Sequence, residues 1–452
     1  MTKFELDEYQ KEAVITNGNI LLIAGAGAGK TFTITKKVEY LISQNICLPE
    51  EILIISFTNK SINDLKKKIN YNCSILTFHK LAIQILKDYN QEFNLVSDNY
   101  LYYVTNEFFY SLIDVDLIKE LLLYFKEYNY QKFLNSFKYK EFSKVIVNII
   151  KIYKTNGCTK DDIKRIYKSN SLLGKYMYII KNIYEQDLLA NNSYDFDDLI
   201  IKATKILNNK YRYKYIIVDE FQDTSQIRFN LINKLRILND AHLFVVGDDY
   251  QSIYHFSGCN LNLFLDFAKL VPNSKILKLK YTYRNSQELI NISANFIMKN
   301  TKQIKKDLIS NKHIVKPIEF IYYLNPKKAF NKLYQNIKKI NSDLLVLGRN
   351  NKDIIKFSDN KNINYLTVHS SKGLEAENVI LINLVDDTYG FPNQIKNHKI
   401  IEELHPSDKE ILFAEERRLF YVALTRTKNK VYILVPLFRK SCFIKELKKM
   451  IK

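Results

Sequence analysis

The stretch ILLIAGAGAGKT, residues 20–31, joins a short apolar run to a glycine-rich segment, and an amphipathic helical pattern, FTITKKVEYLI, begins at residue 32. Glycines allow backbone N–H groups to close around phosphate oxygens, and the N-terminus of the helix adds partial positive charge. Lys30 can reach the β- and γ-phosphates, and the Thr31 hydroxyl can hold Mg²⁺. The stretch therefore predicts a nucleotide-phosphate loop made of Ala24, Gly25, Ala26, Gly27, Ala28, Gly29, Lys30 and Thr31. The general pattern begins with Gly, where this chain has Ala24.

A strand–loop–helix unit of this kind belongs to a sheet of parallel strands, and other short apolar runs can supply that sheet. Such runs are bounded by polar or turn-forming residues, as buried parallel strands are. A first set lies at residues 20–24, 52–56, 215–219 and 243–247. A second set, with helical patterns at 286–300 and 413–425, lies at 275–280, 344–348, 365–369, 378–384 and 430–435. The sequence predicts an α/β fold with two parallel-sheet cores and a cleft between them.

Residues from about 86 to 194 interrupt the first set with apolar positions at helical spacing and almost no Pro or Gly. They predict an all-helical insertion. The expected domains are a first ATP-binding core (1–85 and 195–275), the insertion (86–194) and a second core (276–452). Residues 388–410 are polar enough for a long loop.

The stretch VDEFQDT, residues 218–224, ends an apolar run with two adjacent acids. A strand end beside a phosphate loop is where a magnesium-coordinating carboxylate belongs, so we expect Asp219 to bind the metal through water. Glu220 is the next residue and can orient or deprotonate the water that attacks the γ-phosphate. The two acids are expected to divide metal binding from base catalysis.

The chain is strongly basic, with 68 Lys and Arg against 48 Asp and Glu and a formal net charge of +20. This balance favours a nucleic-acid partner, because neutralised phosphates release condensed counterions. An AT-rich genome would supply many Lys, Asn, Ile and Tyr residues whatever the function, so the charge alone leaves both interpretations open. Only ten basic residues are Arg, and several lie in the motifs below, where a planar fork is needed.

Five cysteines stand far apart without a C-x-x-C pair, which argues against a zinc site or a disulfide framework. The start, MTKFELDEYQ, lacks the apolar core of a signal peptide. No uncharged apolar run reaches the roughly 18 to 20 residues of a membrane span. We expect a soluble cytoplasmic protein without a membrane partner.

Several segments together resemble, in order and spacing, the signature of superfamily 1 helicases of the UvrD/Rep/PcrA group. They are LDEYQKEAV, AGAGAGKT, ISFTNKSINDLKKKI, LTFHKLA, YDFDDLI, VDEFQDTS, VVGDDYQSIYHFSG, YTYRNSQELI, LTVHSSKGLEAENVIL and EERRLFYVALTRTK. The resemblance covers nearly the whole chain except residues about 90–185 and 305–340. It implies two RecA-like P-loop cores, ATP and Mg²⁺ as cofactors, and single-stranded or tailed duplex DNA as partner.

The resemblance also implies roles for individual residues around the nucleotide. Gln10 looks like the amide that reads the adenine edge, Tyr283 like the aromatic that stacks on the base, and Glu375 like the ribose contact. Gln251 resembles the γ-phosphate sensor that couples hydrolysis to motion. Arg284 and Arg426 look like the two arginines of the second core that reach across the cleft to the γ-phosphate. A guanidinium from a separate domain stabilises developing charge only when the cleft is shut, which would link hydrolysis to closure.

The same resemblance places a track for single-stranded DNA. The residues implied are Phe57, Asn59, Thr77, Phe78, His79, Tyr254, Phe256 and His369. Aromatic faces accept any base, while hydroxyl, amide and imidazole groups hold phosphates, so the mixture gives grip without sequence preference. Taken singly, an aromatic residue more often packs in a core.

Three departures from the pattern stand out. Phe32 follows the loop where relatives usually carry Arg, and Ser257 replaces a basic residue of the track. Only residues 355–366, IKFSDNKNINYL, separate LLVLGRNNKDI from TVHSSKGLE, where relatives carry a regulatory domain called 2B. That domain is therefore expected to be absent or vestigial.

The resemblance implies an ATP-dependent single-stranded-DNA translocase or helicase, moving 3′ to 5′ and coupling ATP hydrolysis to closure of the two cores. The missing domain leaves a second interpretation: the motor subunit of a helicase–nuclease complex, as in Gabija-type phage defence or in repair, with little unwinding alone. Its protein partner would be a nuclease or a regulator. A third interpretation is a nucleotide-gated DNA-binding module with little turnover. The presence of every expected ATP-site residue argues against that module.

Overall fold

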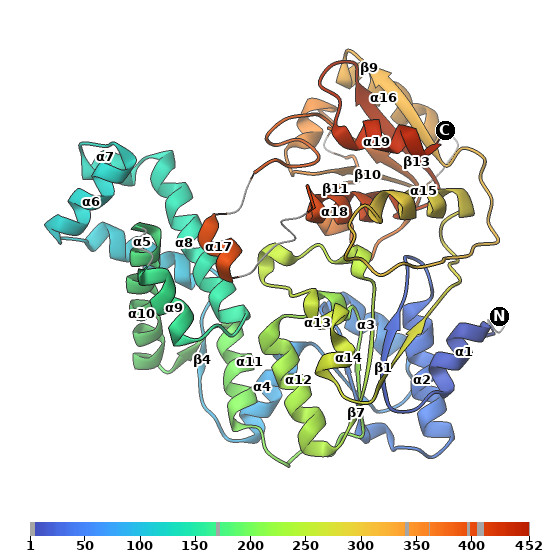
Figure 1. The fold of residues 1–452 in the computed structure, drawn as a ribbon, viewed down its shortest axis with the longest axis horizontal. Coiled ribbons are helices and arrows are strands. Elements are labelled where there is room, and N and C mark those ends of the chain that lie inside the picture. Colours follow the sequence, from blue (N-terminus) through green and yellow to red (C-terminus); the bar gives the residue numbers. More distant parts are fainter. Residues whose placement is uncertain are drawn as a thin grey trace.

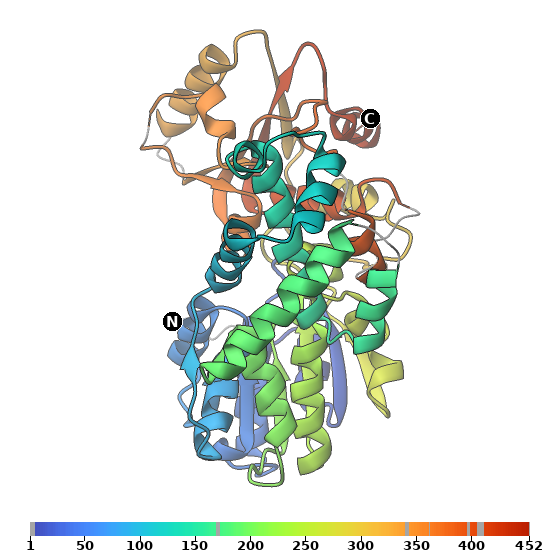
Figure 2. The ribbon, with the colours of Figure 1, turned by 90° about the vertical axis from the view of Figure 1, so that its left-hand side faces the viewer.

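The computed structural model describes residues 5–168, 172–339, 343–360, 362–395, 398–404 and 411–451. Two α/β cores lie one above the other, and a group of helices stands beside them (Figure 1). Viewed from that side, the helices lie in front of the junction between the cores (Figure 2). The predicted α/β fold with two parallel-sheet cores is confirmed.

The first core is built on a six-stranded parallel sheet with the strand order β3-β2-β6-β7-β1-β8. Its strands are β1 (Asn19–Ile23), β2 (Ile52–Ile55), β3 (Ser74–Leu76), β6 (Tyr215–Val218), β7 (His242–Gly247) and β8 (Ser274–Lys278). The central strands are buried on both faces, which is why they read as apolar runs in the sequence. Ile23 of β1 is in register with Gly247 of β7, so their carboxyl ends meet at one edge.

Helices cover both faces of this sheet. One face packs against α1 (Glu8–Ile15), α2 (Lys30–Ser43) and α3 (Asn59–Lys68). The other packs against α4 (Phe78–Asp88), α11 (Phe196–Ile206), α12 (Gln226–Asn239), α13 (Asn262–Leu265) and α14 (Phe267–Leu270). In a doubly wound arrangement of this kind, ligands bind at the carboxyl edge of the sheet.

The second core has a five-stranded parallel sheet with the order β11-β10-β12-β13-β9. Its strands are β9 (Ile318–Tyr323), β10 (Leu344–Gly348), β11 (Tyr365–Thr367), β12 (Ala376–Leu381) and β13 (Thr427–Pro436). Its helices are α15 (Gln287–Ile297), α16 (Pro326–Lys339), α18 (Ala414–Leu424) and α19 (Cys442–Ile451). Only residues 349–364 lie between β10 and β11, so no separate domain stands at that point of the chain.

One strand assignment made from the sequence is wrong. The run at residues 275–280 was expected in the second core, but β8 pairs in parallel with β1 and forms the edge of the first sheet. An apolar run does not specify its sheet, because strand pairing depends on where the chain returns. The range 276–452 expected for the second core therefore begins inside a strand of the first.

The insertion consists of α5 (Tyr100–Ser111), α6 (Val115–Phe125), α7 (Tyr130–Leu134), α8 (Phe137–Thr155), α9 (Lys160–Lys168) and α10 (Leu172–Ala190), with β4 (Asn94–Leu95) and β5 (Ser193–Tyr194) pairing at its base. Its core is apolar and largely aromatic. The stretch 388–410, expected as a loop, contains the helix α17 (Lys399–Leu404), whose apolar side chains pack into this core. Residues 396–397 and 405–410 lie outside the described residues.

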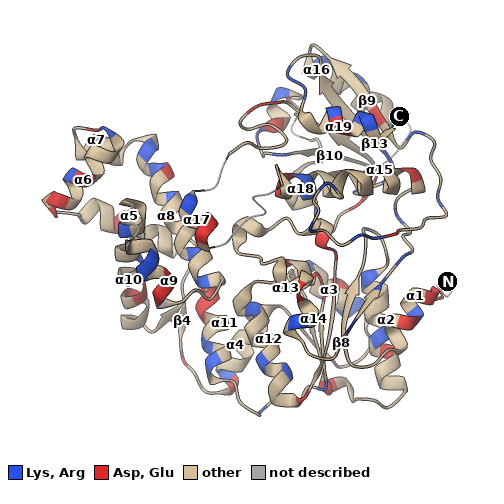
Figure 3. Ribbon diagram, viewed as in Figure 1, with Lys and Arg blue, Asp and Glu red and all other residues tan. Residues whose placement is uncertain are grey.

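Basic residues occur in all three parts of the molecule rather than on one face (Figure 3). Their distribution therefore does not by itself locate a binding surface. None of the described helices is long and apolar enough to cross a membrane.

Candidate nucleotide site and nucleic-acid track

The loop between β1 and α2 needs its glycines for two reasons. Gly27 and Gly29 have φ angles of 73° and 78°, in the left-handed region that glycine adopts at low cost. Side chains that follow β8 in the chain also leave no room for a Cβ atom on two of these glycines. A Cβ atom on Gly25 would lie 2.4 Å from Leu308 Cδ1, and one on Gly27 would lie 2.5 Å from the Cβ of Arg284. Residues beyond β8 therefore press directly on the predicted phosphate loop.

The two acids after β6 point to different partners. The Asp219 backbone N–H donates to the Ile55 carbonyl and continues the sheet, whereas Glu220 turns into the left-handed region with φ 52°. Lys30 Nζ donates to Glu220 Oε1 at 2.7 Å. Gln222 Nε2 donates to Glu220 Oε2 at 2.6 Å. A non-glycine residue in this conformation is often found at functional sites.

The two carboxyl groups have opposite pKa shifts. Burial and the neighbouring Glu220 charge raise the pKa of Asp219 to about 6. Burial alone would also raise the pKa of Glu220, but the ammonium groups of Lys30 and Lys372 outweigh it and hold that pKa at about 2. A pair of acids with separated pKa values is what a division of roles requires.

Gln10 and Tyr283 lie at the start of α2. Gln10 Nε2 donates to the Ala28 carbonyl at 3.4 Å, and a Cβ on Gly29 would lie 2.7 Å from the same nitrogen. The Tyr283 backbone N–H donates to the Gly27 carbonyl at 3.0 Å, and its hydroxyl donates to Asp7 Oδ2 at 2.7 Å. The Tyr283 ring is largely exposed. The expected base-binding amide and ring are thus beside the loop.

Both expected arginines lie where the second core meets residues of the first. Arg426 is 1% exposed, and its Nη2 donates to Gln251 Oε1 at 2.8 Å. Burial, and then the charge of Arg284, lower the pKa of Arg426 to about 9, while Glu220 acts in the opposite direction. The structure therefore brings Lys30, Glu220 and Gln251 of the first core together with Arg284 and Arg426.

Glu375 lies in an ion pair in this structure. Arg284 Nε donates to Glu375 Oε2 at 2.8 Å, and Lys428 Nζ is 3.0 Å from Glu375 Oε1. The expected ribose contact would require this carboxylate to keep one oxygen available beside its two cations.

The expected metal ligands offer few protein oxygens. Thr31 is in the first turn of α2, and Asp219 is buried at the end of β6. Within the described ranges, no group of three or more His, Cys, Asp or Glu side chains could hold a metal ion. This donor set fits Mg²⁺, which keeps several waters and commonly shares phosphate oxygens with one or two protein groups.

Three expected track residues meet where the two cores face one another. The rings of Phe256 and His369 lie 5.5 Å apart, nearly perpendicular, and Tyr254 lies 6.1 Å from Phe256. The Tyr254 hydroxyl donates to the His369 carbonyl at 3.2 Å. Phe256 is 53% exposed, so its face is accessible.

The other expected track residues do not all face solvent. Phe78 is 2% exposed and packs in the core of the first domain, so its ring cannot stack on a base in this conformation. The Thr77 hydroxyl accepts from the Lys80 N–H as the N-cap of α4. Phe57 is half-buried and packs 5.3 Å from Phe78. His79 lies edge-on to Phe196, while Asn59 is exposed at the start of α3.

Two hollows adjoin these residues. A pocket of about 220 Å³ joins Phe57 and Tyr254 to Glu220, and two cations that sequence reasoning missed, Arg228 and Lys372, also line it. Lys372 Nζ bonds to Asp223 Oδ2 at 2.5 Å and to the Gln251 carbonyl at 2.6 Å. The scarcity of Arg could have drawn attention to Arg228, and Lys372 stands inside the VHSSKG motif.

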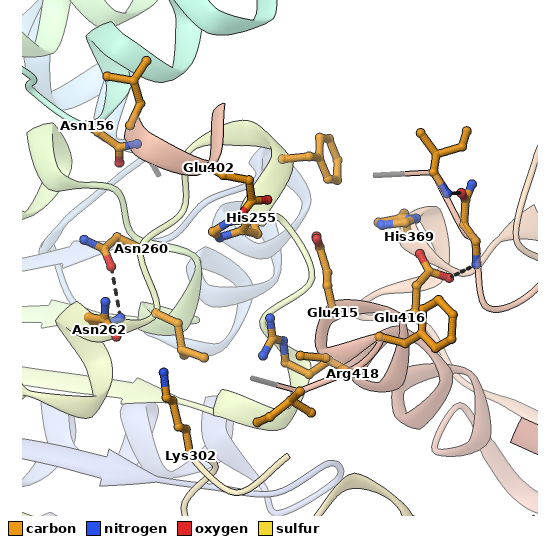
Figure 4. A pocket seen from close by; sticks show the side chains of 18 of the residues that line it. Asn156, His255, Asn260, Asn262, Lys302, His369, Glu402, Glu415, Glu416 and Arg418 are labelled. Carbon is orange, nitrogen blue, oxygen red and sulfur yellow. Dashed lines mark hydrogen bonds between the residues drawn. The ribbon is translucent and has the colours of Figure 1, made fainter. Parts of the chain in front are cut away.

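The larger hollow, of about 1690 Å³, lies between the end of α8, the loop after β7 and α18. Asn156, His255, Asn260, His369, Glu415 and Arg418 are among the residues that line it (Figure 4). Burial raises the pKa of Glu415 to about 7, although Arg418 opposes the shift. Phe256 and His369 also line this hollow, so these two expected track residues open into a large space with both polar and apolar walls.

Comparison with known families gives two matches. "UvrD/REP helicase N-terminal domain" fits residues 6–272, which is more than half of the chain, and "UvrD-like helicase C-terminal domain" fits residues 355–436. The first match includes the phosphate loop, the acids after β6 and the insertion. The second includes Glu375, His369 and Arg426.

Individual relatives agree with these matches. The chain is 34% identical over 326 residues to a "Probable DNA helicase II homolog" of Mycoplasma capricolum, covering 68% of this chain and 42% of the relative. It is 27% identical over 497 aligned residues to "DNA helicase IV" of Escherichia coli, covering 98% and 70%. It is 28% identical over 377 residues to "ATP-dependent DNA helicase PcrA" of Bacillus subtilis, covering 76% and 47%. The chain thus spans about half the length of the first and third of these relatives.

Proposed function

The chain belongs to the UvrD/REP helicase family, and from this premise we propose that it is an ATP-driven motor that moves along single-stranded DNA. One observation carries the proposal: Lys30 and Glu220 of the first core form an ion pair, and Arg426 of the second core lies near Glu220 and donates to Gln251. A phosphoryl-transfer site divided between two bodies links turnover to their relative position. The names of the relatives support DNA as the track.

The ion pair between Lys30 and Glu220 supports a defined order of events. In our proposal, the Lys30 ammonium group leaves Glu220 and hydrogen-bonds the β- and γ-phosphates when ATP enters. Glu220 then still accepts the hydrogen bond from Gln222. The pKa of Glu220 then rises from about 2, because Lys30, the stronger of the two cations that lower it, has been withdrawn while Lys372 remains. Glu220 becomes a better proton acceptor for the attacking water when the substrate is in place.

Asp219 and Thr31 would hold Mg²⁺, which neutralises charge on the β- and γ-phosphates. Arg284 and Arg426 would stabilise the charge that develops in transfer. Gln251, bonded to Arg426 at 2.8 Å, would report the state of the γ-phosphate to both cores. Closure of the cores on ATP and opening after hydrolysis would then alternate the grip of Tyr254 and Phe256 against that of His369. The family resemblance supports movement from 3′ to 5′.

A second candidate function is the motor subunit of a complex with a nuclease or a regulator. The observation that favours it is the short connection between β10 and β11, residues 349–364, where no regulatory domain is inserted. Such a motor would hydrolyse ATP on single-stranded DNA yet displace little duplex alone. Strand-displacement assays on duplexes with a 3′ or a 5′ single-stranded tail separate the two functions, and preference for a 5′ tail would contradict the proposed direction.

The decisive experiment is the ATPase rate with and without single-stranded oligonucleotide for the wild type and Lys30→Ala. We expect DNA to stimulate the wild type and the substitution to lower that rate by at least about 100-fold, since it removes a preorganised cation at the transferred phosphate. Lys36→Ala is the matched control, because Lys36 is on the same helix, pairs with Glu39 and otherwise lies 5.8 Å from the centre of the Phe32 ring, without a bond to Glu220. Equal rates for Lys30→Ala and the wild type would refute ATP-driven motion.

A further inference from the structure

A loop of the second core, residues 298–310, crosses onto the first core after α15. Gln303 Nε2 donates to the carbonyl and to Oδ2 of Asp249, each at 3.0 Å, and the Ile304 N–H donates to the same carboxylate at 2.8 Å. Leu308 lies over Gly25 of the phosphate loop. The loop therefore contacts both the phosphate loop and the end of β7.

Lys306 is the buried cation of this loop. Its side chain is 3% exposed, while the side chains of Asp248 and Asp249 are 0% exposed. The ammonium group pairs with both carboxylates, at 2.5 Å from Asp249 Oδ1, and lies 3.5 Å from the centre of the Tyr250 ring. Two adjacent buried acids need such a counter-charge, because an unpaired buried charge is strongly destabilising.

Asp248 connects this cation to the candidate catalytic groups. Its Oδ2 accepts from Gln251 Nε2 at 2.6 Å, and its backbone N–H donates to Gln222 Oε1 at 2.9 Å. Gln222 in turn donates to Glu220. Asp248 thus positions the expected γ-phosphate sensor, Gln251, through its side chain. It positions the expected general base, Glu220, through its backbone N–H and Gln222.

From this geometry we infer that Lys306 is a positioning residue, which holds Asp248 so that Gln251 and Glu220 take their reactive places only when the 298–310 loop is seated on the first core. The inference rests on the proposed function and deepens it: Lys306 touches no substrate and acts through Asp248. It provides a second link between the cores, separate from the arginines that face the phosphates. Because the ion pair between Lys306 and Asp248 is buried, a small displacement of the loop changes the electrostatic environment of Asp248 sharply.

A purely structural ion pair would make different predictions. It would change thermal stability while each folded molecule kept its turnover number. A positioning residue changes the turnover number with little effect on the KM for ATP, because groups that bind the nucleotide, such as Lys30 and Tyr283, remain in place. The neighbouring Lys305 supplies a matched comparison, since its side chain is 76% exposed and lies 3.6 Å from an equally exposed Asp307.

The test compares Lys306→Met with Lys305→Met in single-stranded-DNA-stimulated ATPase assays, with the folded fraction measured by thermal unfolding. We expect Lys306→Met to lower kcat about 10- to 100-fold, the loss typical of a slightly misplaced catalytic group, with the KM for ATP changed less than about threefold. Lys305→Met should match the wild type. If Lys306→Met does not fold, the double variant Lys306→Met and Asp249→Asn is used instead, because it removes one charge of each sign and keeps Asp248. Its kcat should also fall. A wild-type kcat in either Lys306 variant would overturn the inference.

A double-mutant cycle with Gln251→Ala tests the route of the effect. If Lys306 acts through Asp248 on Gln251, Lys306→Met should add less than about twofold in the Gln251→Ala background, whereas independent effects would multiply. The same cycle is measured on the basal kcat without DNA, because the inference concerns the hydrolysis step and not nucleotide binding. Should the wild type hydrolyse ATP without stimulation by DNA, the proposed function fails, and the cycle on the basal kcat decides for or against Lys306 alone. Multiplicative effects in the measured cycle would overturn the inference.

Discussion

The candidate nucleotide site and the expected nucleic-acid track are built differently, although both include residues where the two cores meet. At the nucleotide site, charged side chains from distant segments are buried and bonded to one another, as in the pair Arg426 and Gln251 at 2.8 Å. Along the track, aromatic rings from both cores lie near one another, and some are exposed while others are packed in the core. A buried charge needs a particular partner, so it fixes the arrangement of a site. An aromatic ring can pack equally well against a base or in a protein core.

The largest expected effect is on ATP hydrolysis and comes from a substitution at the candidate nucleotide site. Arg426→Lys should lower the DNA-stimulated kcat about 1000-fold, because a lysine cannot supply the planar fork that stabilises developing phosphate charge. The dissociation constant for single-stranded DNA should change less than about twofold, since Arg426 is buried away from the rings of the track. Steady-state kinetics and fluorescence anisotropy measure the two quantities.

The matched control is Arg439→Lys, because Arg439 is an exposed arginine of the second core that pairs with Asp387 at the surface. It should leave both quantities unchanged. A loss of DNA affinity in Arg426→Lys as large as its loss of kcat would mean that the two sites are not separable in the way their construction indicates.

The backbone of the candidate nucleotide site could be predicted from the sequence, because a strand–loop–helix unit depends on neighbouring residues. A glycine-rich turn between strand and helix gives nearly the same loop wherever it occurs, so Gly27 and Lys30 could be placed from their neighbours alone. The acids after β6 followed from the end of an apolar run. The positions of Arg284 and Arg426 could not be reached from spacing, and only the family resemblance placed them in the cleft.

The parts that sequence reasoning placed less well depend on distant packing. The strand β8 was assigned to the wrong sheet, β9 was not predicted, and α17 was taken for a loop. Six residues of α17 are too short to show a periodic pattern, and their partners are in the insertion. Phe78 was expected on the track, but a single aromatic residue after Thr77 carries no signal that distinguishes a core position from an exposed one.

The next prediction contrasts two phenylalanines that the sequence assigned to the same track. Phe78→Ala should destabilise the protein by about 3–5 kcal/mol through loss of a buried ring. Phe256→Ala should leave stability within about 0.5 kcal/mol, as for an exposed position. It should weaken binding of single-stranded DNA by about 1–3 kcal/mol through loss of base stacking. Chemical denaturation and binding titrations give both values for each variant.

This contrast would fail in a definite way. If Phe256→Ala binds DNA like the wild type, the exposed ring beside His369 is not a stacking surface, and the track must follow other side chains. If Phe78→Ala loses DNA affinity without losing stability, the core position of its ring must open when DNA binds.

The smallest expected effect concerns pH and separates the two sites by their titrating groups. The pKa of Asp219 is raised to about 6 by burial and by the charge of Glu220, so this carboxyl group becomes protonated as the pH falls through 6 rather than through its usual range near 4. A protonated carboxyl group cannot hold the metal, and the ATPase rate should therefore fall about tenfold per pH unit below that point.

Histidines of the track do not titrate there, because burial and neighbouring cations lower the pKa values of His79 and His369 to about 4. Mg²⁺ competes with the proton for Asp219, so about tenfold more Mg²⁺ should move the acidic limb toward lower pH by about one unit. Burial also raises the pKa of Glu415, to about 7, but Glu415 lines the large hollow of the track, and its titration would not depend on Mg²⁺. Burial raises the pKa of Asp223 to about 6 as well, so an acidic limb that Mg²⁺ leaves unmoved would assign the loss of activity to Asp223 or Glu415 and not to Asp219.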